Sequence, residues 1–288
     1  MSPAGGTGGG SGIGGGSIGN TRDGISSRHE RILSLLESRG FVSIGSLAKS
    51  FSVSEQTVRR DLNDLERRGL VTRYHGGAGL PPVTGDVDYD KRKRRHAKEK
   101  QRIAALVAGQ IPEGATIFID IGTTMEAVAE ALLNHRRLTV VTNHLTVATI
   151  LNRKREFQVI LAGGVLKHND QATTGEATRE FLEKFRVGYG IFGIGGVTED
   201  GDLMDFDFRD IGVSAMAMKI SRKRLVALDH SKFTSEAMVR VAHLRDVDMV
   251  FTDAAPPAPL SRMMRDSGVQ LFVAGADDGS SKVTALRR

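Results

Sequence analysis

The sequence contains no cysteine and no apolar run long enough to cross a membrane. Without cysteine there can be no disulfide scaffold, no thiolate-bound zinc, no iron–sulfur cluster and no cysteine nucleophile. A membrane helix needs roughly 18 consecutive apolar residues, whereas the densest apolar run, 103–111, is short and interrupted. The start of the chain also lacks the basic region and apolar core of a signal peptide. We therefore expect a cytoplasmic protein without membrane contact.

Glycine looks abundant, with 34 residues, but 10 of them lie within residues 1–19. A Gly/Ser-rich stretch of this kind behaves as a flexible chain and cannot bury a core. We therefore expect residues 1–24 to be a disordered tail and leave them out of the fold. What remains has an ordinary globular composition. We expect residues 276–288 to be a second tail.

The net charge of +6 is unevenly distributed along the chain. Residues 25–79 hold nine basic and six acidic side chains, and residues 88–102 hold eight basic and three acidic ones, which together give +8. A basic run is often only a solvated surface, but a basic N-terminal part and connector favour a polyanionic partner such as DNA. Gly- and Pro-rich residues separate the two segments. We expect domains at 25–80 and 97–275, joined by a linker at 81–96.

Residues 26–69 show three stretches of helical periodicity. Ser26 and Ser27 are suitable N-caps for a first helix, which stops at Gly40. A second, short helix follows over 44–51. Ser54 can cap a third helix by accepting a bond from a free backbone N–H. The apolar residues at helical spacing are Ile32, Leu33, Leu36, Ile44, Leu47, Ala48, Phe51, Val58, Leu62 and Leu65.

A strand-like segment, 70–74, and a turn at His75, Gly76 and Gly77 follow the third helix. Three helices with a short turn before the third, then a two-stranded wing, describe a winged helix-turn-helix. The third helix of this motif enters the major groove of DNA. Periodicity alone also allows a three-helix packing module with surface arginines.

The string VSEQTVRRDL at 53–62, followed by RYHGGA at 73–78, closely resembles the DNA-binding signature of the DeoR family of bacterial transcriptional regulators. Asp61 is expected to order an arginine, because a carboxylate facing phosphates is repulsive. The resemblance implies that double-stranded operator DNA is a partner, contacted by Ser54, Gln56, Thr57, Arg59, Arg60, Arg73 and His75.

From residue 97 onward, short apolar runs alternate with helical patterns. Such alternation predicts a mainly parallel sheet with helices on both faces. Strands are expected at 116–120, 138–142, 157–161, 189–193 and 225–229, with helices starting near 125, 144 and 176.

Polar residues and glycines follow these strands, and ligands of open parallel sheets bind beyond the carboxyl ends of the strands. The segment 120–124, DIGTT, places a glycine and two hydroxyls before a helix N-terminus, which favours an anion. Each strand end alone is also compatible with an ordinary turn. Four ends on one edge, with Lys232 as a countercharge, favour a phosphate site.

The order IDIGTT, VVTN, LAGG and DHSKF extends the DeoR resemblance over about residues 26–260. It implies an effector domain related in fold to ribose-5-phosphate isomerase, and a phosphorylated polyol or sugar as ligand. The strings FIDIGTT, ALLNH, ILAGG, GEAT and TDA favour glycerol 3-phosphate within the family. The resemblance also implies a homo-oligomer, a dimer or a tetramer. The implied ligand-binding residues are Asp120, Gly122, Thr123, Thr124, Thr142, Asn143, Gly163, Gly164, Asp210 and Lys232.

The chain departs from the family pattern at three positions, which bear on the choice of effector. Gly188 stands where the family usually has Asp, Asp210 where it has Glu, and Ser214 where it often has Lys. The polyol end of the ligand therefore stays open, and a DeoR-type regulator of another sugar-phosphate regulon is the alternative.

An enzyme is the other alternative, since Asp205, Asp207 and Asp210 could supply acid–base groups. The glycine stretch 193–196 lacks the paired aspartates of the isomerase motif, and an isomerase needs no DNA-binding module. The eight histidines show no i, i+4 pair, so we expect no metal and no other cofactor. The sequence therefore predicts a transcriptional repressor, with no catalytic residues, whose operator affinity is controlled by a phosphorylated polyol or sugar.

Overall fold

The computed structural model describes residues 26–39, 41–74, 76–79, 86–167, 170–235 and 237–275. The two expected tails, 1–24 and 276–288, and His75 lie outside these described residues. Among the helices that are described, none combines the length and the apolar character of a membrane span.

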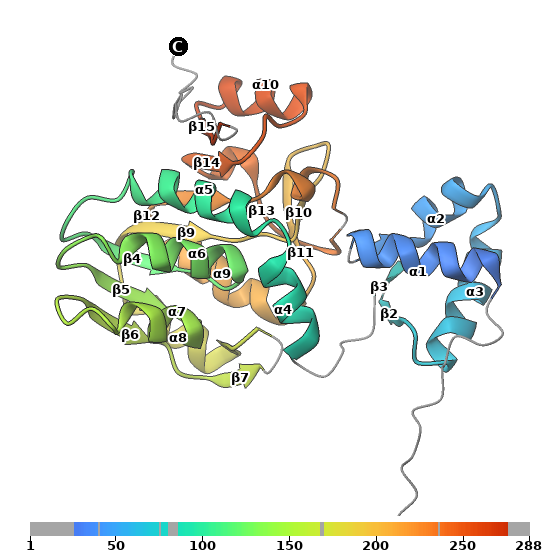
Figure 1. The fold of residues 1–288 in the computed structure, drawn as a ribbon, viewed down its shortest axis with the longest axis horizontal. Helices are drawn as coiled ribbons and strands as arrows, with labels where there is room; N and C mark the ends of the chain where they lie inside the picture. Colours follow the sequence, from blue (N-terminus) through green and yellow to red (C-terminus); the bar gives the residue numbers. More distant parts are fainter. Residues whose placement is uncertain are drawn as a thin grey trace, which may run out of the picture.

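The N-terminal domain consists of α1 (Ser27–Arg39), α2 (Ile44–Phe51) and α3 (Glu55–Arg67), with a small antiparallel sheet of β1 (Phe41–Ser43), β2 (Thr72–Tyr74) and β3 (Gly77–Gly79) in the order β1-β3-β2. The expected apolar positions form its core, and Ile32, Leu47 and Leu62 are completely buried. The predicted winged helix-turn-helix is confirmed, and β1 is an additional strand. Figure 1 shows this domain in blue, beside the larger C-terminal domain.

Close packing explains one glycine of the wing. A Cβ atom on Gly77 would lie 2.3 Å from Cζ of Phe41 and 2.5 Å from the carbonyl oxygen of Val42. Gly77 pairs with Ser43 of β1 and Tyr74 of β2. Only glycine lets β3 lie between the other two strands at this point.

The C-terminal domain is built on a seven-stranded sheet in the order β15-β14-β12-β9-β4-β5-β6, with every neighbouring pair parallel. The predicted parallel α/β fold is confirmed. The first five strands along the chain match the expected positions closely, whereas β14 and β15 are additional. The strands are β4 (Thr116–Ile119), β5 (Thr139–Thr142), β6 (Gln158–Leu161), β9 (Val187–Phe192), β12 (Ser221–Ala227), β14 (Met249–Thr252) and β15 (Gln270–Val273).

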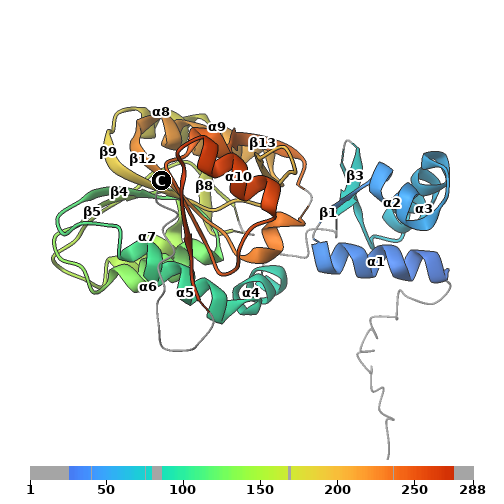
Figure 2. The same cartoon turned by 90° about the horizontal axis from the view of Figure 1, so that it is seen from above.

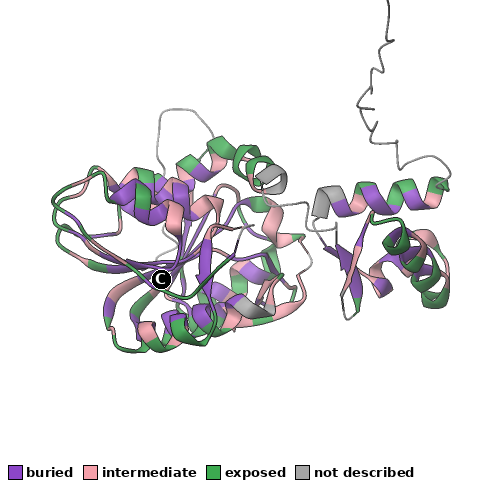
Figure 3. Cartoon of the chain, turned by 90° about the horizontal axis from the view of Figure 1, so that it is seen from below, coloured by how far each residue is buried: buried purple, intermediate pink, exposed green. Residues whose placement is uncertain are grey.

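Alternate residues of each central strand enter two separate hydrophobic cores. In β4, Ile117 and Ile119 pack on one face of the sheet and Phe118 on the other, as the two-residue period of a strand requires. Figure 2 shows α5, α6 and α7 on one side of the sheet and α8, α9 and α10 on the other, and Figure 3 shows the buried strands between them. These helices are α5 (Ala97–Ala108), α6 (Thr123–Leu132), α7 (Leu145–Leu151), α8 (Glu176–Glu183), α9 (Phe208–Ile220) and α10 (Ala258–Asp266).

Smaller elements surround the carboxyl ends of the parallel strands (Figure 1). Residues 86–94, which we placed in the linker, form a helix, α4 (Asp86–Arg94), that contacts α6. The others are the hairpin of β7 (Val165–Lys167) and β8 (Ala172–Thr174), the sheet of β10 (Gly196–Val197), β11 (Asp202–Asp205) and β13 (Val239–His243), and the short helices η1 (His230–Phe233) and η2 (Leu244–Asp246).

Candidate functional site

The N-terminal half of α3 presents polar side chains to solvent. Ser54 is the N-cap, and its hydroxyl accepts a hydrogen bond of 3.2 Å from the backbone N–H of Thr57, as expected. Gln56, Arg59 and Arg60 are exposed, while Val58 is fully buried on the opposite face. The helix therefore presents exposed polar side chains beside a fixed N-terminus, an arrangement that a helix entering the major groove requires.

Two of the expected DNA contacts already have partners within the domain. Arg59 forms an exposed i, i+4 ion pair of 3.0 Å with Glu55, which solvent makes weak. Arg73 on β2 donates a hydrogen bond from its guanidinium to Oδ1 of Asn63, and so ties the wing to α3. Ser54, Gln56, Thr57 and Arg60 share the same helix, and the role of all these residues in DNA binding stays a prediction.

The expectation that Asp61 orders an arginine is confirmed. The Asp61 carboxylate accepts hydrogen bonds from Nε and Nη2 of Arg28 at 2.6 and 2.9 Å, and Nε2 of His29 lies 3.4 Å away. Burial raises the pKa of Asp61, but Arg28 and His29 lower it by more, so that it lies below its usual value. This ion pair joins α1 to the buried face of α3.

The candidate effector site lies where β12, β9, β4, β5 and β6 end, side by side at one edge of the sheet. Gly122 follows β4 and is the N-cap of α6, with a φ of 111° that an L side chain would adopt only under strain. Thr123 opens α6, and Thr124 is half-buried beside it. The free N–H groups of this turn favour an anion.

Basic side chains gather near this turn. Lys100 of α5 is buried, and its Nζ donates a 3.0 Å hydrogen bond to the hydroxyl of Thr123. The pKa of Lys100 is lowered to about 8, mainly by burial and also by Lys232 and Arg92, against the effect of Asp229, which raises it. Burial also lowers the pKa of Lys232, against the effect of Asp229. We call Arg92, Lys100 and Lys232 the cationic cluster.

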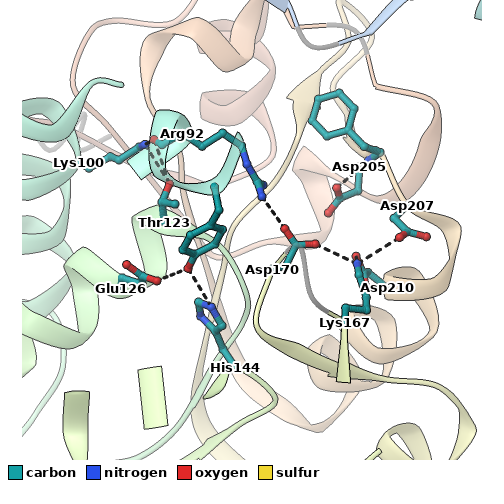
Figure 4. Close-up of polar contacts among 12 residues, drawn as sticks. Arg92, Lys100, Thr123, Glu126, His144, Lys167, Asp170, Asp205, Asp207 and Asp210 are labelled. Carbon is teal, nitrogen blue, oxygen red and sulfur yellow. Dashed lines mark hydrogen bonds and ion pairs between the residues drawn. The ribbon is translucent and has the colours of Figure 1, made fainter. Parts of the chain in front are cut away.

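A second group of charged residues lies at and just after the ends of β7 and β11 (Figure 4). Nζ of Lys167 lies 2.5 Å from the carboxylate of Asp210, 3.0 Å from that of Asp170 and 3.2 Å from that of Asp207. Asp205 is the last residue of β11, and its pKa is raised to about 6, mainly by burial. We call these four aspartates and Lys167 the carboxylate cluster.

The two departures from the family pattern on α9 lie at this edge of the sheet. Ser214 donates weak hydrogen bonds of 3.4 Å to both oxygens of the Asp120 carboxylate. Burial raises the pKa of Asp120 well above its usual value, and Asp205 and Asp210 raise it further. Asp120 has no cation as a hydrogen-bond or ion-pair partner in the described part of the chain. The third departure, Gly188, lies at the amino end of β9 and so away from this edge.

Several expected ligand residues already use their polar groups to support the strand ends. The Thr142 hydroxyl donates to the carbonyl of Ile119 at 2.7 Å, and the carbonyl of Gly163 accepts from Thr178. Asn143 donates its amide to the carbonyl of Thr173, while its buried Oδ1 has no partner among the residues that the structure describes. Gly164 packs against Thr178 so closely that a Cβ would lie 2.0 Å from its hydroxyl. All ten expected ligand residues thus lie at this edge, and their contact with a ligand stays a prediction.

The helix α4 contributes residues that the sequence analysis did not select. Its Tyr89 donates a hydrogen bond to the buried Glu126 and lies 3.2 Å from Nε2 of His144, and Lys93 pairs with Glu126 at 2.9 Å. Arg92 pairs with Asp170 at 2.6 Å (Figure 4).

These contacts correct our interpretation of the basic connector. We counted its charge toward DNA, but Arg92, Lys93 and Lys100 instead bond within the C-terminal domain. The run of basic residues at 91–95 was the sequence signal for these contacts. A charge run does not show which surface its side chains face.

Comparisons with known proteins match both parts of the chain. Residues 28–82 match the DeoR-like helix-turn-helix domain, and residues 95–254 match the DeoR C terminal sensor domain. The chain is 46% identical to the glycerol-3-phosphate regulon repressor of Escherichia coli, over 85% of this chain and 97% of that protein. It is 44% identical to the same repressor of Haemophilus influenzae, over 80% of this chain and 89% of that protein.

Among solved structures, ribose-5-phosphate isomerase A of Neisseria gonorrhoeae matches with a TM-score of 0.36 at 18% identity, over 48% of this chain and 53% of that one. The two family matches cover both domains in the order in which they follow one another along the chain. The chain therefore belongs to the DeoR family of transcriptional regulators, with an N-terminal helix-turn-helix domain and a C-terminal sensor domain.

Proposed function

We propose that this protein is a DNA-binding repressor whose operator affinity falls when glycerol 3-phosphate binds its sensor domain. The observation that carries the proposal is the cationic cluster at the Gly122–Thr124 turn, on the same sheet edge as the carboxylate cluster. The identity of 46% to a glycerol-3-phosphate regulon repressor over nearly its full length supports this choice of effector.

The two clusters suit the two ends of a polyol phosphate. The phosphate would accept hydrogen bonds from the N–H groups of Gly122–Thr124 and from Lys100 and Lys232, because charge-assisted bonds to phosphate are strong. The hydroxyls would bond to polar groups such as Asp120 and the Oδ1 of Asn143, which has no partner within the described ranges. Neither end requires a reaction, and we assign no catalytic residue.

Operator binding would use α3 in the major groove and the wing beside it. Helix-turn-helix repressors commonly read two half-sites about 34 Å apart as dimers, so we propose that the chain acts as a homo-oligomer. Since its DNA target lies in the bacterial cytoplasm, we place the protein there.

A thermal-shift experiment on the full chain tests the effector. A ligand that binds only the folded state at 100 times its Kd adds about 2.7 kcal/mol to the free energy of unfolding. Glycerol 3-phosphate should raise the midpoint by several degrees, whereas glycerol and inorganic sulfate at equal concentration serve as controls. No shift with glycerol 3-phosphate, together with a shift for another sugar phosphate, would refute the choice of effector.

A second candidate is a regulator of another sugar-phosphate regulon. The observation that favours it is Ser214, which leaves Asp120 without a cationic partner at the end expected to bind hydroxyls. The same experiment with a panel of phosphorylated sugars separates the two, since each ligand presents the same phosphate but different hydroxyls.

A further inference from the structure

The C-terminus of α4 lies against the turn where the phosphate is proposed to bind. The last carbonyl groups of a helix lack partners within the helix. The Arg92 carbonyl is one of these, and it accepts hydrogen bonds from Nζ of Lys100 and, at 3.5 Å, from the hydroxyl of Thr123. A carbonyl oxygen at the negative end of α4 therefore faces the positive end of α6.

Lys100 and Thr123 are thus engaged by the protein's own backbone. Lys100 is 7% exposed, and its ammonium group bridges the Arg92 carbonyl and the Thr123 hydroxyl. A phosphate bonded to both groups would need the position that the carbonyl oxygen now holds. The carbonyl carries only a partial charge, whereas a phosphate is a full anion and bonds to Lys more strongly.

The remaining contacts of α4 with the sensor domain are polar. Of its described side chains, 89–94, none belongs to either hydrophobic core of the domain. The helix is held by Tyr89 on Glu126 and Lys93 on Glu126. Arg92 on Asp170 is the third contact (Figure 4). Because none of these described side chains enters a hydrophobic core, α4 can leave its place without disturbing either core.

We propose that the effector's phosphate displaces the Arg92 carbonyl from Lys100 and Thr123, so that effector binding and the present position of α4 exclude each other. The proposal rests on the proposed function, because it assigns the regulation of the same site. α4 begins seven residues after the last strand of the wing, so its release changes the restraint on the DNA-binding domain. The effector thereby favours a second position of the connector, and differential binding to the two states lowers operator affinity.

Hydrogen exchange on the full chain tests the displacement directly. With saturating glycerol 3-phosphate, amides of residues 89–95 should exchange faster, while those of 122–126 should exchange more slowly. Slower exchange in both segments would mean that α4 closes over the ligand, and it would overturn the proposal. Unchanged exchange of 89–95 with a bound ligand would overturn it as well.

The substitution Tyr89→Phe tests the competition without touching the phosphate donors. Losing the hydrogen bond to Glu126 weakens the attachment of α4 to the sensor domain. The affinity for glycerol 3-phosphate should therefore rise roughly fivefold, as expected for one hydrogen bond. The effector concentration that halves operator binding should fall by the same factor. The matched control is Tyr189→Phe on β9, which lies outside this site and should change neither value.

Lys93→Met gives an independent check, because the two explanations predict opposite signs. Removal of a positive charge near an anion site weakens binding by simple electrostatics, whereas removal of the Lys93–Glu126 pair tightens it under the proposed competition. Weaker or unchanged binding in both Tyr89→Phe and Lys93→Met would overturn the proposal and leave the proposed function intact. If no phosphorylated compound binds the parent protein, the proposed function fails and the competition fails with it.

Discussion

Lys167 joins three carboxylates at the edge of the sheet where the effector is proposed to bind. Its side chain is 8% exposed and bonds to three carboxylates from β11–α9 and the β7–β8 hairpin. Burial lowers the pKa of Lys167, but Asp170, Asp210 and Asp207 raise it well above its usual value. One buried ammonium thus neutralises much of a cluster that would otherwise repel itself.

Lys167→Met should therefore destabilise the sensor domain. Removing one partner of a buried ion pair leaves unpaired charges behind, at a cost of about 3–5 kcal/mol in the free energy of unfolding. Urea denaturation followed by circular dichroism measures this loss. Lys184→Met, at an exposed position after α8, is the control and should change stability by less than about 0.5 kcal/mol.

Asp205 shows the opposite situation, a carboxylate that the fold makes harder to ionise. Its pKa is raised to about 6, mainly by burial and also by Asp210 and Asp170, against the bond from the backbone N–H of Phe206, which lowers it. The folded state then binds its proton more tightly than the unfolded state does. The contribution of Asp205 to stability accordingly decreases as the pH rises from about 4 to 6.

Asp205→Asn should stabilise the protein, and more so at higher pH. Asparagine carries no charge and keeps an oxygen that can accept the Phe206 bond. The gain in the free energy of unfolding should grow by about 1–2 kcal/mol between pH 5 and pH 7.5, measured by urea denaturation at both values. An equal gain at both values would contradict the raised pKa. Asp266→Asn, at an exposed position of α10, should show no such growth.

At the scale of elements, the basic side chains of α3 and those of α4 face different surroundings. α3 buries Val58, Leu62 and Leu65 and leaves its arginines at the surface. α4 instead directs Arg92 and Lys93 to carboxylates of the sensor domain. Similar compositions therefore serve different partners, because each helix is oriented by what it packs against.

Arg60→Ala should weaken operator binding roughly tenfold, because Arg60 is exposed on the helix proposed to enter the groove. If Arg60 contacts a phosphate, the slope of log K against log salt should also decrease by about 1. Gel shifts with an operator selected from random DNA measure both values. Arg153→Ala, on the sensor domain, is the control. Unchanged affinity in both Arg59→Ala and Arg60→Ala would contradict the role of α3.

At the scale of the molecule, operator recognition should depend on two copies of the chain. A duplex with two half-sites should bind on the order of 100-fold more tightly than a duplex of equal length with one half-site scrambled. Analytical ultracentrifugation of the complex should then find at least two chains per duplex. Equal affinity for the two duplexes, with one chain bound to each, would contradict the oligomer.

Local signals in the sequence predicted a large part of this structure. Ser54 as a cap and the parallel strands from 116 to 229 follow from spacing and residue type, which act over a few residues. That Asp61 orders an arginine followed from its charge, but its partner Arg28 lies 33 residues away. The small elements β1, β7–β8 and β10–β11–β13 were not predicted. They are two to five residues long, too short for a periodic pattern, and they form only because the larger domain provides partners.

The sequence alone determined the order of domains, the DNA-binding motif, the parallel sheet and the edge where polar residues gather, because periodicity, caps and strand ends are local properties. Only the tertiary structure decided that Lys100 and the Arg92 carbonyl meet at Thr123, and that Lys167 bonds to three aspartates. Charge counts give the sign and number of the groups. Which charges face one another depends on how distant segments pack, and that geometry pairs Arg92, Lys93 and Lys100 with groups of the sensor domain.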